Sequence, residues 1–149
     1  QLRQRLEENP DDQRGWVLYA RTMVFLERLE EARDAFSRAM ELGADENADL
    51  LAEYADVLAA TSGGLEGRPE ELIQQALEKD PENARALWLA GTAAYNRSDY
   101  EQAEGYWQRL LEVVPQDSGV AERIRKNLEE LPGPGSGGAG ASAGSPDPG

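Results

Sequence analysis

The stretch ARALWLAGTAAYNRSDYEQAEGYWQRLLEVVPQD, residues 84–117, carries the pattern on which the interpretation of the whole chain depends. Two sets of five positions share the same mutual spacings: Trp16, Ala20, Ala32, Phe36 and Ala39 in the first, and Leu87, Gly91, Ala103, Trp107 and Leu110 in the second. The offset between the sets is 71 residues, which is 35 plus 36. Self-similarity at such a period indicates a repeat architecture, so a middle copy is expected between the two.

The middle copy is present in the sequence, because Leu51, Ala55 and Leu58 repeat the first helix, and Ile73 and Ala76 repeat the second. We therefore predict an all-α chain with three helix–turn–helix repeats at about 13–46, 48–83 and 84–117. Residues 1–12 are interpreted as the end of a preceding helix and a linker. The reason is that the segment from Leu6 to Pro10 copies the segment from Leu77 to Pro81, where proline ends a helix.

The C-terminal part of the chain changes character twice. Residues 118–131 form one more amphipathic pattern, with Val120, Ile124, Leu128 and Leu131 on one face and Ser118 as the expected N-cap. We interpret this helix as a polar cap of the repeat array, the alternative being a part of a binding surface. Residues 132–149 contain seven Gly, four Pro, three Ser and three Ala, which predicts a disordered tail that serves as a spacer.

Composition excludes most catalytic chemistry. The chain has no Cys and no His, which removes thiolate nucleophiles, the commonest general base and the commonest metal ligands. With 15 Lys+Arg against 29 Asp+Glu the formal charge is −14, which argues against a nucleic-acid partner. No run approaches the roughly 20 apolar residues of a membrane-spanning helix, so no direct membrane contact is expected of this fragment. We predict a non-enzymatic binding protein without a cofactor or metal; hydrolysis by paired carboxylates is the remaining catalytic alternative.

The spacing Trp–x3–small–x11–Ala–x3–aromatic–x2–Ala–x4–Pro resembles the tetratricopeptide repeat, and residues 84–117 fit that repeat over their full 34 positions. The resemblance covers about 105 of the 149 residues. It implies a right-handed helical solenoid whose first helices line a concave groove for a peptide or a helix of a partner.

A narrower resemblance is to the repeat domain of the cytochrome c maturation subunit family CcmI/CycH, to which NrfG is related. The segments that carry it are GWVLYAR at 15–21, DLLAEYADVL at 49–58, the glycine-bearing insertion at 63–67, QALEKDPENARALWLAG at 75–91 and YWQRLL at 106–111. The resemblance implies capture of the C-terminal helix of apocytochrome c and its presentation to other haem-ligation subunits. It also implies a periplasmic location, with a tether to the inner membrane through a segment absent from this chain. The rival interpretation is a generic repeat scaffold for another cell-envelope assembly.

The fold resemblance implies which residues of the three first helices face the groove. They are Arg14, Val17, Arg21, Val24 and Phe25 in the first repeat, Asp49, Ala52, Asp56, Ala59 and Ala60 in the second repeat, and Arg85, Trp88, Thr92, Tyr95 and Asn96 in the third repeat. Trp88 and Tyr95 are seven residues apart and share one helix face, which favours aromatic anchors for a guest. The alternative is that both rings complete the core between repeats.

Charged groove positions have two interpretations each. Arg14, Arg21 and Arg85 are candidates to hold a partner's terminal carboxylate or acidic side chains, or else they pair with nearby Glu. Asp49 and Asp56 suit a basic amphipathic helix, or they belong to an acidity that serves solubility or salt adaptation. The insertion at 61–69 is either a tolerated surface loop or a partner contact.

Overall fold

Residues 2–132 are described by the computed structural model, and every regular element among them is helical. In chain order these are α1 (Leu2–Glu8), α2 (Gln13–Phe25), α3 (Leu29–Glu41), the 3-10 turn η1 (Ala44–Glu46), α4 (Ala48–Ser62), α5 (Arg68–Lys79), α6 (Ala84–Asn96), α7 (Tyr100–Val113) and α8 (Gly119–Glu129). The prediction of an all-α chain is confirmed. Within the described residues, none of the helices combines the length and the apolar character needed to cross a bilayer.

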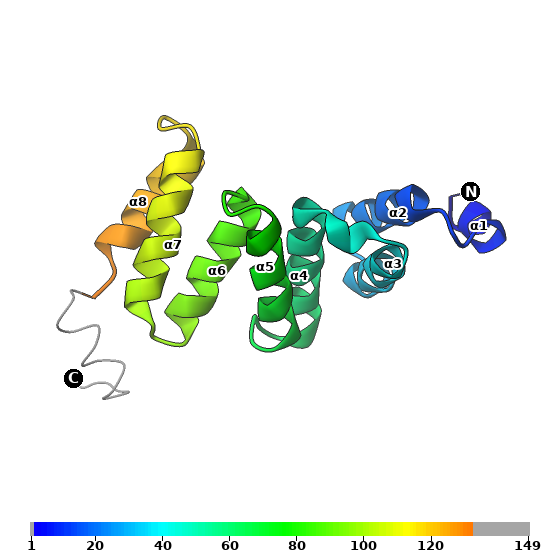
Figure 1. Cartoon of the computed structure of the whole chain (residues 1–149), viewed down its shortest axis with the longest axis horizontal. Coiled ribbons are helices and arrows are strands. Elements are labelled where there is room, and N and C mark those ends of the chain that lie inside the picture. The colour runs from blue at the N-terminus through cyan, green and yellow to red at the C-terminus, as the bar shows by residue number, and fades with distance from the viewer. Residues whose placement is uncertain (1, 133–149) are drawn as a thin grey trace. The chain divides into compact units, whose positions relative to one another are not determined.

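Helix pairs carry most of the packing: α2 packs on α3, α4 on α5, and α6 on α7 (Figure 1). In addition, α3 contacts α4, and α7 contacts α8. The chain divides between Asp80 and Pro81 into two compact units, the first containing α1 to α5 and the second α6 to α8. The boundaries predicted for the three repeats stay a prediction, and the predicted tail at 132–149 lies outside the described residues except for Pro132.

Short polar side chains fix where the first helix of each pair begins. An N-cap oxygen accepts a hydrogen bond from a backbone N–H in the first turn, and this satisfies a donor that the helix cannot pair internally. Asp12 Oδ1 accepts from the backbone N–H of Gly15 at 2.9 Å. In the same way, Asn47 Oδ1 accepts from the N–H of Leu50 at 3.1 Å, and Asn83 Oδ1 from the N–H of Ala86 at 2.9 Å. Ser118 likewise accepts from the N–H of Ala121 at 3.1 Å and starts α8, so its predicted capping role is confirmed.

The turns that end α2 and α6 share an unusual backbone geometry. Glu27 and Ser98 have φ of 60° and 65°, and no other non-glycine residue between 2 and 132 has a positive φ. They are 71 residues apart, which is the offset between the first and third predicted repeats. The left-handed region is costly for a residue with a Cβ, so these two turns store local strain at equivalent places.

Small residues allow the paired helices to approach. In the first unit Phe36 is fully buried among Ala20, Ala32 and Ala39, all of which are inaccessible to solvent. In the second unit Trp107 lies so close to Gly91 that a Cβ added there would overlap the indole Nε1 and Cδ1. Ala20 and Gly91 therefore stand at equivalent positions where a small residue faces a large ring.

The glycine-bearing insertion forms the connection between α4 and α5. Gly63 and Gly67 adopt φ of 93° and 86°, and Pro69 stands in the first turn of α5, where its missing N–H costs nothing. Glycine is needed at both positive-φ positions because other residues are strained there. Whether the loop is a tolerated insertion or a partner contact stays a prediction.

Candidate functional site

Helix α2 and its C-cap residue Leu26 carry large apolar side chains that are exposed to solvent. Leu18, Val24, Phe25 and Leu26 are 57%, 38%, 85% and 51% exposed. Leu18 and Phe25 are seven residues apart and therefore lie on the same side of the helix, about two turns from each other. Apolar side chains gathered in this way on a soluble surface are typical of a contact site for another chain. We call these four residues the α2 apolar patch.

Two predicted groove residues of the first unit are not on the surface. Val17 is buried in the core cluster that includes Ala20, Met23 and Phe36. Ala52 is fully buried, because α4 packs on both α3 and α5 and keeps little of its surface exposed. The predictions that Val17 and Ala52 line an open groove are therefore wrong.

Leu18 and Leu26 were missed by the sequence analysis. The groove count placed residue 17 on the open face, whereas the structure exposes residue 18. A signal was available, because Leu18 lies four residues after Arg14 and seven before Phe25, which is the spacing of one helical stripe.

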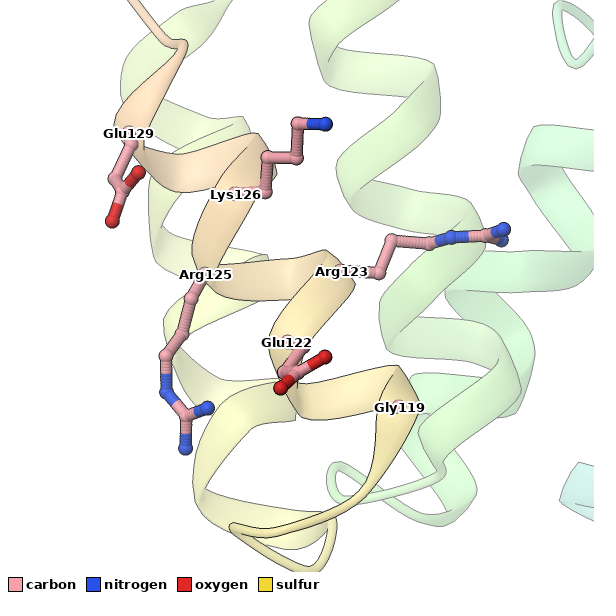
Figure 2. Close-up of a pocket in the computed structure, with 6 residues that line it drawn as sticks. All are labelled: Gly119, Glu122, Arg123, Arg125, Lys126 and Glu129. Atoms are coloured by element: carbon pink, nitrogen blue, oxygen red, sulfur yellow. The ribbon is translucent and has the colours of Figure 1, made fainter.

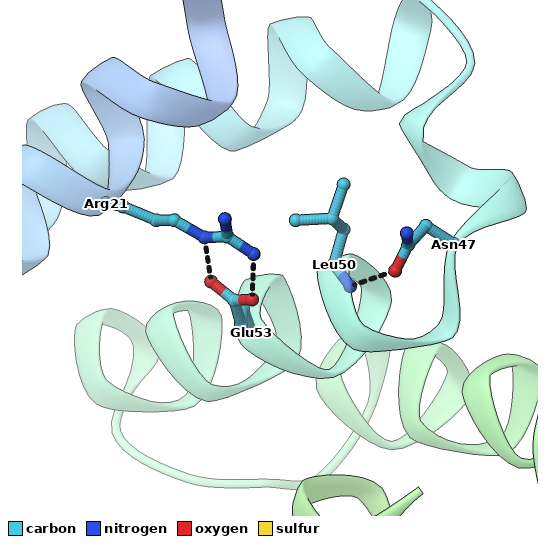
Figure 3. Close-up of polar contacts among 4 residues, drawn as sticks. All are labelled: Arg21, Asn47, Leu50 and Glu53. Carbon is cyan, nitrogen blue, oxygen red and sulfur yellow. Dashed lines mark hydrogen bonds and ion pairs between the residues drawn. The ribbon is translucent and has the colours of Figure 1, made fainter. Parts of the chain in front are cut away.

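Arg21 is occupied by a residue of its own chain. Its Nε donates a hydrogen bond to Glu53 Oε1 at 2.9 Å, and its Nη2 donates one to Glu53 Oε2 at 2.6 Å. The pair is therefore bidentate and joins α2 to α4 (Figure 3). The hydrogen bond to Glu53 raises the pKa of Arg21 further above its usual value, and the charges of Glu53 and Asp49 act in the same direction. Of the two alternatives for Arg21, the structure shows the pairing with a nearby Glu, which fastens α2 to α4.

The remaining charged candidates of both units divide into engaged and free groups. Asp49 is exposed and Asp56 half-buried, and both interact with other residues of the chain, as does the exposed Arg85. Arg14 is exposed, and it forms no hydrogen bond or ion pair with any residue between 2 and 132.

Aromatic rings of the second unit stack around Trp107. The ring of Trp88 lies 6.0 Å from that of Trp107 in a stacked arrangement, and the ring of Tyr95 lies 5.9 Å from it. Tyr95 also meets Tyr100 edge-on at 5.5 Å. Trp88 is half-buried and Tyr95 is 45% exposed, so each ring covers Trp107 with one side and keeps another side accessible. They belong partly to the core of the α6–α7 pair and partly to its surface.

The other two predicted positions on α6 differ in what they offer. Thr92 is half-buried, and its hydroxyl donates to the carbonyl oxygen of Trp88 at 2.9 Å within the helix. Asn96 is the exposed last residue of α6.

The outer face of α8 has charges of both signs around a shallow depression of about 580 Å³. Its lining residues are Gly119, Glu122, Arg123, Arg125, Lys126 and Glu129. Arg125 donates to the carbonyl oxygen of Gln116 at 2.7 Å. Figure 2 shows Arg123 and Lys126 extending to one side of the helix, whereas Arg125 and Glu129 extend to the other.

Among the described residues, no metal-binding cluster accompanies these surfaces. Within residues 2–132, no group of three or more His, Cys, Asp and Glu side chains is placed to hold a metal ion. The features found are instead apolar side chains, aromatic rings and cations, which are the groups that hold another protein segment by contact.

The chain is similar to proteins of cytochrome c biogenesis. Residues 1–121 match the family described as the cytochrome c-type biogenesis protein H TPR domain. Cytochrome c-type biogenesis protein CycH of Pseudomonas aeruginosa is 31% identical over 129 residues, which are 86% of this chain and 31% of that protein. Cytochrome c-type biogenesis protein CcmH of Escherichia coli K12 is 29% identical over 87% of this chain and 37% of its own length. The chain thus spans about a third of these relatives.

Two further similarities concern the same repeat fold. The formate-dependent nitrite reductase complex subunit NrfG of Escherichia coli O157:H7 is 26% identical over 75% of this chain and 57% of its own length. Among solved structures, the Arabidopsis OM64 TPR domain superposes with a TM-score of 0.65 at 19% identity, over 79% of this chain and 94% of that one. The predicted tetratricopeptide-repeat fold is therefore confirmed.

Proposed function

Because the chain belongs to the family of cytochrome c-type biogenesis protein H TPR domains, we propose that it is a non-catalytic peptide-binding module. Its guest is the C-terminal helix of apocytochrome c, which it holds and presents for haem ligation. It acts in the periplasm beside other haem-ligation subunits, held at the inner membrane through a part of the whole protein outside residues 1–149.

The observation that carries the proposal is the α2 apolar patch. Leu18 and Phe25 are separated along α2 by about 10.5 Å, the rise of seven helical residues. An amphipathic guest helix presents its apolar anchors at i, i+3, i+4 and i+7, so two anchors seven residues apart meet two hosts at the same separation. Phe25 is the natural host for one anchor because 85% of its surface is open to contact.

The second unit supports the same function with different chemistry. Trp88 and Tyr95 are held in place by their stacking on Trp107, so their exposed surfaces are rigid. Rigid aromatic rings lose little conformational entropy on binding, which is why such rings dominate the energetics of interfaces. The chain's charge of −14 adds a field that attracts a guest rich in Lys.

Calorimetric titration of the chain with a synthetic peptide of the apocytochrome c C-terminal helix tests the proposal. A scrambled peptide of equal charge is the control. We expect a Kd of about 10 μM or tighter, roughly −7 kcal/mol, and no binding of the scrambled peptide. Equal binding of both peptides would reduce the interaction to charge attraction. Binding of neither would reject the apocytochrome guest and favour a scaffold for another envelope assembly.

A pair of variants connects binding to the patch. Phe25→Ala removes an exposed ring and is expected to weaken the cytochrome peptide by about 2 kcal/mol, as loss of an anchor does. Val113→Ala is the matched control, because Val113 is also apolar and exposed, at 39%, but lies at the end of α7. If both variants bind like the parent chain, the patch is not the site.

A further inference from the structure

We propose that Arg123 and Lys126 on α8 form a cation pair that binds the terminal carboxylate of the captured helix. This inference rests on the proposed function and adds to it the polarity of the guest, whose last residue lies at α8. The sequence pattern favoured a polar cap for α8 and left a part of a binding surface as the alternative.

Cations without a partner are rare among residues 2–132. All 15 Lys and Arg residues lie between 2 and 132, and 11 of them interact with other residues of the chain, mostly with Glu. The four that form no hydrogen bond or ion pair with a described residue are Arg5, Arg14, Arg123 and Lys126. Arg123 and Lys126 alone among these four are neighbours on one helix, although Glu122 and Glu129 flank them.

The directions of the Arg123 and Lys126 side chains suit a shared ligand. Residues three apart on a helix share a face, and Figure 2 shows Arg123 and Lys126 extending to the same side of α8. Arg125, which lies between them in sequence, is turned away and is held by Gln116 at 2.7 Å. Two cations that form no hydrogen bond or ion pair with a described residue therefore extend from the same side of α8, and both line the depression on its outer face.

The C-terminal end of a guest helix is negatively charged and therefore suits two cations. The last turn of a helix exposes unpaired carbonyl oxygens and carries the negative end of the helix dipole, and the chain terminus adds a full negative charge. A guanidinium beside an ammonium group supplies charge-assisted donors to both carboxylate oxygens. Such a group finds few other unpaired cations on residues 2–132, because only Arg5 and Arg14 likewise form no hydrogen bond or ion pair with a described residue.

The position of Arg123 within α8 fits this arrangement. Arg123 is the fifth residue of α8, as Trp88 is the fifth residue of α6, and both helices belong to the second unit. The same unit therefore carries an aromatic surface for the apolar side chains of the guest and a cationic one for its end.

A thermodynamic cycle tests the assignment in the whole chain. The probes are two forms of the N-acetylated apocytochrome c C-terminal peptide, one with a free carboxylate and one with a terminal amide. The protein variants are the double substitution Arg123→Gln with Lys126→Gln, and Arg5→Gln as a control that removes an equally free cation from α1. Far-ultraviolet circular dichroism checks that each variant retains its helices.

We expect the parent chain and Arg5→Gln to bind the free acid about fivefold more tightly than the amide, which is the scale of an exposed ion pair. In the double variant the two forms should bind equally, because the cycle isolates the coupling between the carboxylate and the cations. The difference should also shrink between 0.05 and 0.5 M salt as screening increases.

Three outcomes would overturn the assignment. Equal binding of both peptide forms by the parent chain would show that no terminal carboxylate is recognised, while the proposed function stands. A fivefold difference that persists in the double variant would place carboxylate recognition elsewhere. If the Arg14→Gln variant then binds the free acid and the amide equally, Arg14 is the residue that recognises the carboxylate. Binding of neither form would reject the proposed function together with the cation pair.

Discussion

Replacing Gly91 by alanine should destabilise the second unit, although alanine is the better helix former. A Cβ at residue 91 would overlap the indole of Trp107, because its three nearest neighbours would be Nε1, Cδ1 and Cε2 of that ring. The ring has no room to withdraw, because Trp88 stacks against it and Tyr95 packs at 5.9 Å. Trp107 is only 4% exposed, and its Nε1 has no hydrogen-bond partner among the described residues. The ring is therefore held by packing and not by a hydrogen bond.

The magnitude follows from two opposing effects. Overpacking a core by one methyl group costs about 1–3 kcal/mol, and here the neighbour is a rigid ring, which favours the upper part of the range. The gain in helix propensity from Gly to Ala is about 1 kcal/mol. We therefore expect Gly91→Ala to lower the free energy of unfolding by about 2 kcal/mol in chemical denaturation.

Gly105 provides a matched control in the same unit. It lies inside α7, and a Cβ added there meets no atom within 4 Å. Gly105→Ala should therefore stabilise the protein by about 0.5–1 kcal/mol, since only the backbone effect operates. If Gly91→Ala is as stabilising as Gly105→Ala, the close approach of Trp107 to α6 is refuted, and with it the repeat register that places a small residue at 91.

Three further predictions concern the turns, the interhelix ion pair and the core. Glu27→Gly and Ser98→Gly should each raise the free energy of unfolding by about 0.5–1 kcal/mol, because glycine relieves a positive φ; a loss in both, measured by urea denaturation, would contradict the strained turns. Glu53→Gln breaks the bidentate bond to Arg21 and should cost about 0.5–1 kcal/mol, since Arg21 is half exposed; a cost unchanged in 1 M salt would exclude an ionic origin. Trp107→Ala should cost roughly 3–5 kcal/mol as a buried aromatic does, and a thermal midpoint equal to that of the parent chain would show that the ring is not core.

The sequence predicted those features that repeat along the chain. An offset of 71 residues relates Trp107 to Phe36 and Gly91 to Ala20, and these four are the large and small partners at the two helix pairs. The pattern is readable because close helix packing demands a small residue opposite a large one, whatever the rest of the sequence does.

The surface residues were less predictable, because exposure depends on neighbours far away in sequence. Nothing in the local spacing of Arg21 indicates Glu53, which lies 32 residues later on another helix. Val17 and Leu18 are adjacent and both apolar, and only the orientation of α2 against its neighbours decides that Val17 is buried and Leu18 exposed. A shift of one residue along a helix turns the side chain by about 100°. A groove count that is wrong by one position therefore selects a residue on a different face of the helix.

The proposed surfaces divide the work of recognition according to their chemistry. Apolar contact supplies affinity in proportion to the area removed from water, and it is nearly indifferent to the direction of a guest helix. Within the second unit, the exposed surfaces of Trp88 and Tyr95 can therefore hold an amphipathic helix in either orientation. A charged contact is directional, because only one end of the guest carries a carboxylate and the negative pole of the helix dipole. Arg123 and Lys126 would then decide which way the guest lies, and amidation of the peptide should impair that choice more than it impairs affinity.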